Sequence, residues 1–471
     1  MELTDLTISQ IQQGLAKKQF SALDLTKAYL NRIGKRNKKI LAILTLCEKS
    51  ALSKAKEIDN LLLQGNSIPP LAGVPCVIKD NILVKGVKCT AGSKILENYI
   101  ASYDASVVKL LKKQGAIILG KGNLDEFAIG SSGEHSAFGK TLNPCDLTRV
   151  PGGSSSGPVA AVADNLCAFA LGSDTGGSIR LPASFCGVTG FKPTYGAVSR
   201  FGLMAMASSL DQIGPIAKTS YDAEIVFRAI SEKDPYDSTS LGVAKENVSS
   251  LKNLCFGVPK EYFIKGIDKS VEKAIRNAIK KLEENGAKIK EISLPNTEYA
   301  LAVYYIIMTS EVSANLARYD GIKYGYLKKE KTLINDYLET RGSGFGEEVR
   351  RRIMLGTYAL SAGYYEAYYL KAQKVRTLIR RDFERAFQKV DMILTPVSPT
   401  LPFKIGEKMN DPLSMYLSDI FTVPLNLAGL PGISIPIGKE KGLPIGIQMI
   451  GKEFSDYKIL KAAQVAEKIW M

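Results

Sequence analysis

The sequence predicts an α/β fold, a single large layered α/β/α domain around a mixed, twisted β-sheet. Two segments, DASVVKLLKKQGAIILG (104–120) and 268–294, each have the pattern of a helix that ends at a glycine and is followed by an apolar strand. Helices that alternate with strands in this way indicate helical layers packed on a sheet. Apolar runs at 392–397, 432–438 and 444–451 predict further buried strands. The last two are joined by a short turn, which favours a mixed sheet.

The first sixty residues are predicted to form an N-terminal helical segment. Thr7 or Ser9, and then Ser21, are candidate helix N-caps, and apolar residues recur at helical spacing after Ser21. The chain has no repeat of fixed period and no linker long enough to separate independent domains. We therefore expect one domain over residues 1–471, with residues 1–60 packed on it.

Composition and charge set broad limits on function. A chain of 471 residues with 45% hydrophobic content buries a large core, which excludes a disordered or fibrous protein. The acidic N-terminus MELTDLTISQ and the lack of a long apolar run predict a cytoplasmic protein without a signal peptide or membrane span. The net charge of +15 fits a polyanionic partner but does not require one.

One local excess of charge lies at residues 350–385, which hold nine basic and three acidic side chains. Most of these are expected on a solvated helix face, and a contact to RNA or to a partner protein is the alternative. The seven cysteines include no C-x-x-C pair, and His135 is the single histidine. Zinc sites and disulfide frameworks use closely spaced ligands, so we expect no metal and free thiols.

Two motif matches are rejected because each lacks a residue that its chemistry requires. GAIILGKG (115–122) approximates a phosphate-binding loop, but Gly122 stands where the Mg-binding Ser or Thr belongs, and the apolar residues before it predict a buried strand. GSSSG (153–157) matches the nucleophile elbow of α/β-hydrolases, which needs a histidine downstream of the serine. Because His135 lies upstream, a Ser-His-Asp triad of that kind is excluded.

A serine can instead be activated by a lysine that burial keeps neutral. LAGVPCVIKDNI (71–82) places Lys79 at the end of the apolar stretch 74–78. Desolvation at such a position lowers the pKa of the lysine and makes it a base near neutral pH. On its own, this stretch favours a strand-end lysine that reaches solvent.

A second glycine–serine cluster changes that interpretation. GSDTGGSIRLPASFCG (172–187) follows an apolar segment, and two glycines before Ser178 allow a close approach of the backbone. The successive N–H groups of Thr175, Gly176 and Gly177 can form an oxyanion hole. A plain turn explains one such cluster, but not two clusters together with the lysine.

Together, GVPCVIKDN, PGGSSSG and GSDTGGSIRLPASFCGVTGFKPTYG resemble the amidase signature family, whose catalytic residues are a serine, a second serine on a cis peptide and a lysine. By this resemblance, Ser178 is the nucleophile, Ser154 the bridging serine and Lys79 the base. The resemblance also implies the amidase signature fold, with its signature core at residues 71–215. The PGGSSSG run (151–157) is thus expected to be part of a site, with Ser154 as its relay serine.

The resemblance implies a cis bond between Gly153 and Ser154. It also shows two departures, because Ser156 replaces a glycine and Pro158 replaces a small serine of the family pattern. Both flank Ser154 without removing it, so they bear on loop geometry more than on chemistry.

The similarity extends beyond the signature, to the segments 198–215, 304–325, 344–369 and 411–438. These are similar to the A subunits of glutamyl-tRNA(Gln) amidotransferases, a branch of the same family. The resemblance implies a glutaminase whose ammonia converts Glu-tRNA(Gln) to Gln-tRNA(Gln) in a heterotrimer with B and C subunits. It implies no cofactor in this chain, ATP and Mg on the partner, and misacylated tRNA held mainly by the partner. Membrane and DNA contacts are not expected, and Asp-tRNA(Asn) stays open as a second substrate.

Glutamine carries an α-carboxylate and an α-ammonium, and each needs a counter-charge if the amide is to be aimed at the nucleophile. By resemblance, Arg352 and Asp419 form this substrate clamp, and Tyr304, Gly130 and Ser131 are further substrate-binding candidates. Without the resemblance, Arg352 indicates a basic helix face and Asp419 a capped or solvated turn.

Two alternatives remain open from the sequence. A free-standing amidase acting on small or aryl amides would share the catalytic residues and the fold but would lack the clamp. A non-catalytic scaffold could keep the fold, although retention of Lys79, Ser154 and Ser178 opposes it.

Overall fold

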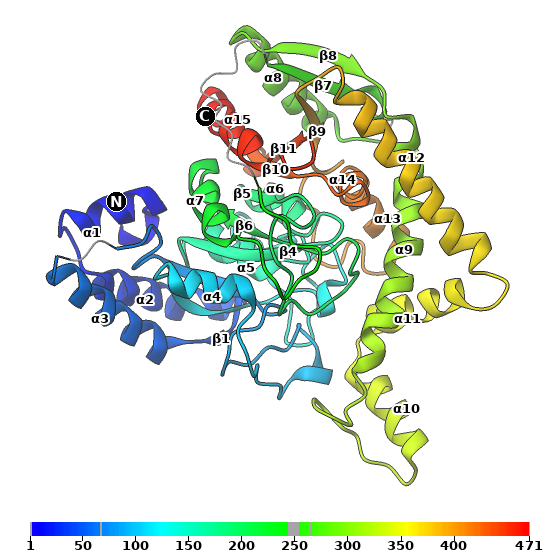
Figure 1. The fold of residues 1–471 in the computed structure, drawn as a ribbon, viewed down its shortest axis with the longest axis horizontal. Helices are drawn as coiled ribbons and strands as arrows, with labels where there is room; N and C mark the ends of the chain where they lie inside the picture. Colours follow the sequence, from blue (N-terminus) through cyan, green and yellow to red (C-terminus); the bar gives the residue numbers. More distant parts are fainter. Residues whose placement is uncertain (1, 66–67, 244–253, 264–265, 471) are drawn as a thin grey trace.

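The computed structural model describes residues 2–65, 68–243, 254–263 and 266–470. Within these residues, eleven strands form one sheet in the order β1-β3-β2-β4-β6-β5-β10-β11-β9-β7-β8 (Figure 1). The pairs β2–β3, β2–β4, β7–β8 and β7–β9 are parallel, and the other pairs are antiparallel. The predicted mixed sheet of an α/β fold is confirmed. The strands are β1 (Ile43–Leu46), β2 (Pro75–Lys79), β3 (Ile117–Gly122), β4 (Phe169–Asp174), β5 (Thr189–Lys192), β6 (Gln212–Ala217), β7 (Cys255–Pro259), β8 (Lys288–Ile292), β9 (Met392–Pro396), β10 (Gly432–Glu440) and β11 (Leu443–Gly451).

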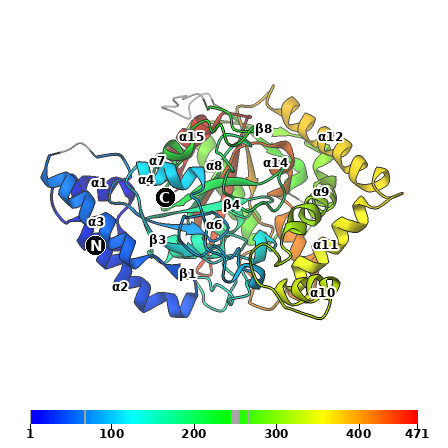
Figure 2. The ribbon, with the colours of Figure 1, turned by 60° about the horizontal axis from the view of Figure 1, so that its bottom comes forward.

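Helices cover the sheet and extend beyond both of its ends. α5 and α6 pack together against β4, β10 and β11, whereas α7, α8 and α15 pack together against β6, β9 and β10. Figure 2 shows α7 and α15 above the strands and α6 below them. The α-helices are α1 (Ile8–Ala16), α2 (Ala22–Ile40), α3 (Glu48–Leu63), α4 (Ser106–Lys113), α5 (Ser156–Ala163), α6 (Arg180–Cys186), α7 (Ser220–Ile230), α8 (Lys269–Glu284), α9 (Ala300–Asn315), α10 (Leu333–Gly344), α11 (Glu347–Leu360), α12 (Lys371–Ala386), α13 (Pro412–Tyr416), α14 (Val423–Ala428) and α15 (Asp456–Trp470).

The elements expected from local patterns are present. The 104–120 segment forms α4 and β3, and the 268–294 segment forms α8 and β8. β10 and β11 pair as an antiparallel hairpin. Thr7 and Ser21 cap α1 and α2, since their side chains accept the backbone N–H groups of Gln10 and Asp24.

The helical N-terminal segment contains one element that the sequence analysis did not predict. β1 follows α2 directly and pairs antiparallel with β3. The single domain over 1–471 stays a prediction, and its end residues lie outside the described ones.

A helical stretch at Pro295–Arg318, which includes α9, is long and apolar enough by composition to cross a membrane. Half of its most apolar window is buried inside the protein. α9 packs against α11, α12 and α14, so it occupies the place of a core helix.

The outermost strands differ in what they expose. β1 is short and lies beside the N-terminal helices. β8 is half solvent-facing, and it exposes Lys288, Lys290 and Glu291 along the end of the sheet.

The direction of the central strands positions the candidate site. β2 and β4 are parallel neighbours, so their carboxyl ends reach the same edge of the sheet. Lys79 is the last residue of β2, and Ser173 and Asp174 end β4. The glycine–serine turns that follow these strands therefore converge there.

Candidate active site

Lys79 is fully buried at the end of β2. Burial lowers the pKa of its ammonium to about 7, although the nearby carboxylates, Asp125 first, oppose the shift. Nζ lies 2.8 Å from Ser154 Oγ and donates to Ser173 Oγ at 2.9 Å and to Ser173 O at 3.2 Å. A neutral amine has two N–H groups, so the Ser173 contacts can take both and leave the lone pair facing Ser154 Oγ.

Ser154 lies on the turn before α5, and its peptide bond with Gly153 is cis, at the position that the resemblance implied. Asp125 supports this turn through hydrogen bonds. Its carboxylate accepts the N–H groups of Gly133 and His135 at 3.0 and 2.9 Å, and its own N–H donates to Ser154 O at 3.3 Å. A Cβ on Gly153 would lie 2.0 Å from Asp125 Oδ2, so only glycine fits there.

Ser178 lies in the turn between β4 and α6. The Ser155 N–H donates to Ser178 O at 3.1 Å, which ties the two serine turns together. Among the described residues, the Ser178 hydroxyl has no hydrogen-bond partner, and 8% of the residue is exposed. The structure thus joins Lys79 to Ser154 directly and leaves the Ser178 hydroxyl unengaged beside them, a common state before substrate binds.

The amides before Ser178 are not equivalent. The Gly177 N–H donates to Asp174 Oδ1 at 2.9 Å, so this amide is already engaged and is not a free oxyanion donor. Within the described part of the chain, the N–H groups of Gly176 and Ser178 have no partner. Of the predicted oxyanion donors, Gly177 is thus engaged elsewhere, while Thr175 and Gly176 stay candidates together with Ser178. The Thr175 hydroxyl is held by a 2.6 Å hydrogen bond to Asp211.

A buried ion pair fixes the loop that carries Ser178. Arg180 Nη2 lies 3.0 Å from Asp174 Oδ1, and Asn426 Nδ2 donates to the same oxygen at 2.9 Å. Burial alone would raise the pKa of Asp174, but Arg180 and these hydrogen bonds outweigh it and lower the pKa to about 2. The carboxylate stays ionised and holds the Gly177 amide in place.

Asp419 is on the 3-10 helix η8 (Leu417–Asp419), where it is buried and not solvated. Its Oδ2 accepts the Ser131 hydroxyl at 2.5 Å. Burial raises the pKa of this carboxyl to about 7, against the opposing effects of Ser131 and Arg352. Thr422 links it to the catalytic loop, since its hydroxyl lies 2.6 Å from Gly176 O and 3.1 Å from Asp419 O.

Arg352 points inward from α11, although it stands in a run of three arginines. Its Nε donates to Glu348 Oε1 at 2.7 Å. The guanidinium carbon lies 4.7 Å and 4.6 Å from the ring centroids of Tyr305 and Tyr416. Nη1 contacts only the soft sulfur of Met308 at 3.6 Å, so N–H donors remain for an anionic ligand.

Three of the five predicted substrate-binding residues line one hollow, and the other two contact its surroundings. Gly130, Ser131 and Arg352 line the same hollow, together with His135. Tyr304 lies against the oxyanion loop, because a Cβ on Gly176 would stand 2.6 Å from the Tyr304 hydroxyl. Ser131 joins Asp419 to the hollow that Arg352 lines, and Thr422 joins Asp419 to the turn before Ser178.

Sequence reasoning missed several residues that hold this site: Asp125, Ser173, Glu348, Tyr305, Tyr416 and Thr422. Ser173 and Asp125 lie near the carboxyl ends of β4 and β3, and that position could have revealed them. The others act through contacts between distant segments, for which the sequence has no local pattern.

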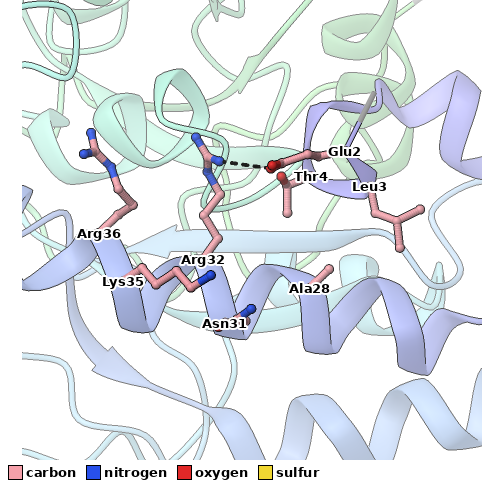
Figure 3. A pocket seen from close by; sticks show the side chains of 8 residues that line it. All are labelled: Glu2, Leu3, Thr4, Ala28, Asn31, Arg32, Lys35 and Arg36. Carbon is pink, nitrogen blue, oxygen red and sulfur yellow. Dashed lines mark hydrogen bonds and ion pairs between the residues drawn. The ribbon is translucent and has the colours of Figure 1, made fainter.

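The remaining expectations concern regions outside the site. β3 is a buried strand, as the rejection of the phosphate-loop match required. No cluster of His, Cys, Asp and Glu that could hold a metal occurs within the described residues. Figure 3 shows another hollow, lined by Glu2 and by Arg32, Lys35 and Arg36 of α2, which contains none of the predicted site residues.

Comparison with known proteins places this architecture in a family. The fold and a buried Lys-Ser pair beside a free serine define an amide-hydrolysing enzyme of the serine–lysine type. The chain belongs to the amidase family, whose model matches residues 24–460.

Individual relatives show which members of the family this chain is similar to. The A subunit of glutamyl-tRNA(Gln) amidotransferase from Thermoanaerobacter pseudethanolicus is 56% identical over 474 residues, which covers 99% of this chain and 97% of that protein. The crystal structure of the corresponding A subunit from Thermotoga maritima is 44% identical with a TM-score of 0.83, and the match covers 99% of this chain and 95% of that one. The peptide amidase of Stenotrophomonas maltophilia is 27% identical with a TM-score of 0.83, over 98% and 96% of the two chains.

Proposed function

We propose that this chain is the glutamine-hydrolysing subunit of a tRNA-dependent amidotransferase. The observation that carries the proposal is the presence of two parts in one chain: a buried lysine 2.8 Å from a serine hydroxyl, and a buried cation and carboxyl, Arg352 and Asp419, that are linked through Ser131 at the hollow that Arg352 lines. The relatives named as A subunits of glutamyl-tRNA(Gln) amidotransferases support it along the whole chain.

The first half of the reaction forms an acyl-enzyme. Lys79 takes a proton from Ser154 Oγ as Ser154 takes one from Ser178, and Ser178 Oγ attacks the amide carbon of the glutamine side chain. The amides of Gly176 and Ser178 stabilise the oxyanion. The C–N bond then breaks, the proton held by Lys79 returns through Ser154 to nitrogen, and ammonia leaves.

The second half reverses these roles with water. Water loses a proton to the same relay and attacks the Ser178 ester, which releases glutamate and restores the serine hydroxyl. The clamp holds the substrate throughout, with Arg352 on the α-carboxylate and ionised Asp419 on the α-ammonium.

In this proposal the ammonia serves a partner. A B subunit would use ATP and Mg to activate the glutamate of misacylated tRNA, a C subunit would join the two, and this chain would bind neither cofactor. The assembly would bind tRNA mainly through the B subunit, and it would work in the cytoplasm, without membrane or DNA. Asp-tRNA(Asn) is a candidate second substrate of the same assembly.

Reconstitution with B and C subunits tests the proposal. The assembly should convert Glu-tRNA(Gln) to Gln-tRNA(Gln) with glutamine, and the Ser178→Ala assembly should do so only when ammonium salt is supplied. Loss of both reactions in the variant would mean that Ser178 is structural. A wild-type chain that hydrolyses simple amides well and forms no assembly would be a free-standing amidase.

A further inference from the structure

The turn at residues 206–211, just before β6, contacts the loop between β4 and α6. β4 and β6 pair antiparallel, with Asp174 opposite Gln212. The next residue of the loop, Thr175, therefore meets the residue before β6, Asp211. The Thr175 hydroxyl donates to Asp211 Oδ1 at 2.6 Å, and the two residues are only 1% and 3% exposed. The pairing of two central strands thus brings a buried carboxylate against the loop that supplies the oxyanion donors.

The carboxylate of Asp211 is itself fixed by its own turn. Its Oδ2 accepts the N–H groups of Met206 and Ala207 at 2.9 and 3.1 Å. Burial raises the pKa of this carboxyl to about 6, against the opposing effects of these bonds and of the Thr175 hydroxyl, so it is ionised at neutral pH. An ionised acceptor makes a hydrogen bond roughly twice as strong as a neutral one. Asp211 therefore offers Thr175 a rigid and charged acceptor.

Helices α9 and α12 hold the 206–211 turn in place. Glu311 of α9 accepts the Ser209 N–H at 2.9 Å and the Ser209 hydroxyl at 2.5 Å. Arg376 of α12 donates to Ser209 O and to Ser209 Oγ, both at 2.9 Å. The turn cannot shift without breaking bonds to two helices, so the carboxylate that it carries is a fixed point for the neighbouring loop.

The run of residues before Ser178 is fixed along its whole length. Each residue of the run has one buried polar contact: Thr175 with Asp211, Gly176 with Thr422 and Gly177 with Asp174. An N–H group stabilises an oxyanion only over a narrow range of distance and direction. A small rotation at the start of the run would therefore carry the donors away from the oxygen that they must meet.

We propose that Asp211 is a positioning residue for the reaction: through the Thr175 hydroxyl, it fixes the backbone N–H groups that stabilise the oxyanion. It acts through Thr175 and not on the substrate. The inference rests on the proposed function, because it needs Ser178 to form an acyl-enzyme. Loss of this bond should slow the chemistry with glutamine and with a simple amide alike and leave KM unchanged, since oxyanion stabilisation acts in the transition state.

Asp211→Asn and Thr175→Val, singly and together in the full chain, test this role. The asparagine oxygen can still accept the N–H groups of the turn, whereas its NH2 group removes the acceptor of the Thr175 hydroxyl. Each single variant should lower kcat by roughly tenfold to a hundredfold on glutamine and on propionamide, with KM within about twofold of wild type. The double variant should lie within about threefold of the slower single variant, because both changes remove the same bond.

A second buried pair of the same chemistry is the matched control. The Thr194 hydroxyl donates to Asp456 Oδ2 at 2.6 Å, and its N–H donates to Oδ1 at 2.8 Å, where the loop after β5 meets α15. Asp456→Asn and Thr194→Val should lower the melting temperature by an amount similar to that of the test variants. Their kcat should stay within about threefold of wild type, because this pair holds no oxyanion donor. A general loss of stability would instead affect both pairs alike.

Equal losses of kcat on both amides, non-additive in the double variant and absent from the control pair, support the proposal. Wild-type kcat in folded Asp211→Asn overturns it, as do additive losses or an equal loss in the control pair. A loss confined to glutamine also overturns it, since that result would place Asp211 with the clamp. If Asp211→Asn does not fold, the same comparison of kcat and KM in Thr175→Val decides.

The pH profile excludes a different route. The charge of Asp211 also raises the pKa of Lys79. If Asp211 acted through that charge alone, Asp211→Asn would move the rise of kcat to lower pH and leave its plateau intact, which would overturn the proposal. A wild-type chain that hydrolyses propionamide but not glutamine would contradict the proposed function, and the propionamide measurements would still decide the role of Asp211.

Discussion

The reacting groups lie at the carboxyl ends of β2 and β4 in the buried centre, whereas the clamp comes from α11 and η8 in the last third of the chain. Lys79 and Ser154 are fully buried and fixed by short hydrogen bonds. Arg352 is held by one carboxylate and two aromatic rings. In the proposed mechanism, the residues at the sheet would carry out the chemistry, and the residues of the outer helices would select the amide that is accepted.

Hydrogen bonds join these two regions at several points, and variants can test the contribution of each region. The Ser131 hydroxyl donates a hydrogen bond to Asp419, and the Thr422 hydroxyl donates one to Gly176 O. At the start of α11, the Gly346 N–H donates to Glu126. If the division holds, variants at the strand ends should reduce hydrolysis of every amide, and variants in the outer helices should act mainly on glutamine.

The largest effect is expected for Ser178→Ala. Glutamine hydrolysis should fall by roughly 10⁴-fold or more, because no other group forms the acyl-enzyme. Ammonia release measures the rate, and mass spectrometry of trapped enzyme should find the adduct on Ser178. Ser156→Ala, which alters a buried serine two positions from Ser154, is the matched control and should retain most activity. An adduct on Ser154 or Ser155 would contradict the assignment.

The next effect concerns the base. Lys79→Arg should be as inactive as Lys79→Ala, since guanidinium stays protonated. In the wild-type enzyme the pKa of Lys79 is lowered to about 7 by burial, so kcat should rise with pH through about 7 as the neutral amine forms. This rise should occur with glutamine and with a simple amide alike. Substantial activity in Lys79→Arg would show that the lysine acts only through its charge.

Variants of the two clamp residues should lose activity on glutamine more than on a simple amide. Arg352→Ala and Asp419→Ala should each lower kcat/KM for glutamine by about tenfold to a hundredfold, the value of one charge-assisted hydrogen bond. A simple amide without α-groups should be affected far less. Arg350→Ala, on the outer side of the same helix, is the control and should leave both substrates near wild type. Equal losses of kcat/KM on both substrates would show that the outer helices do not select glutamine, and would contradict the division between the two regions.

The smallest effect is expected at Glu126, on the 3-10 helix η3 (Glu126–Ala128). Its carboxylate accepts the Ser93 hydroxyl and, at 2.9 Å, the N–H of Gly346, the N-cap of α11. Glu126→Gln should loosen α11 and raise KM for glutamine by about threefold to tenfold, with kcat almost unchanged, because one such bond contributes about 1 kcal/mol. Steady-state kinetics and a melting curve separate this from a general loss of stability. A fall in kcat with constant KM would place Glu126 in the chemistry.

Much of the fold was predictable because the α4–β3 and α8–β8 segments share one local pattern, and because Lys79 and Ser178 follow apolar strands. β1 was not predicted, because a strand of four residues directly after a helix is too short to show a recognisable alternation of apolar and polar residues. Arg352 and Asp419 were predicted as a clamp from the resemblance alone, and that role stays a prediction. Their surroundings depend on contacts such as Ser131 with Asp419, 288 residues apart, which local sequence does not encode.

The exposed edge strand β8 has a consequence for assembly. Lys288, Lys290 and Glu291 place charges where another strand would have to pair, and such charges discourage sheet-to-sheet joining. A partner protein at this end of the molecule would therefore have to make contact through side chains and not through an added strand. A complex formed in that way can be taken apart and rebuilt without breaking the backbone ladder on which Lys79 sits.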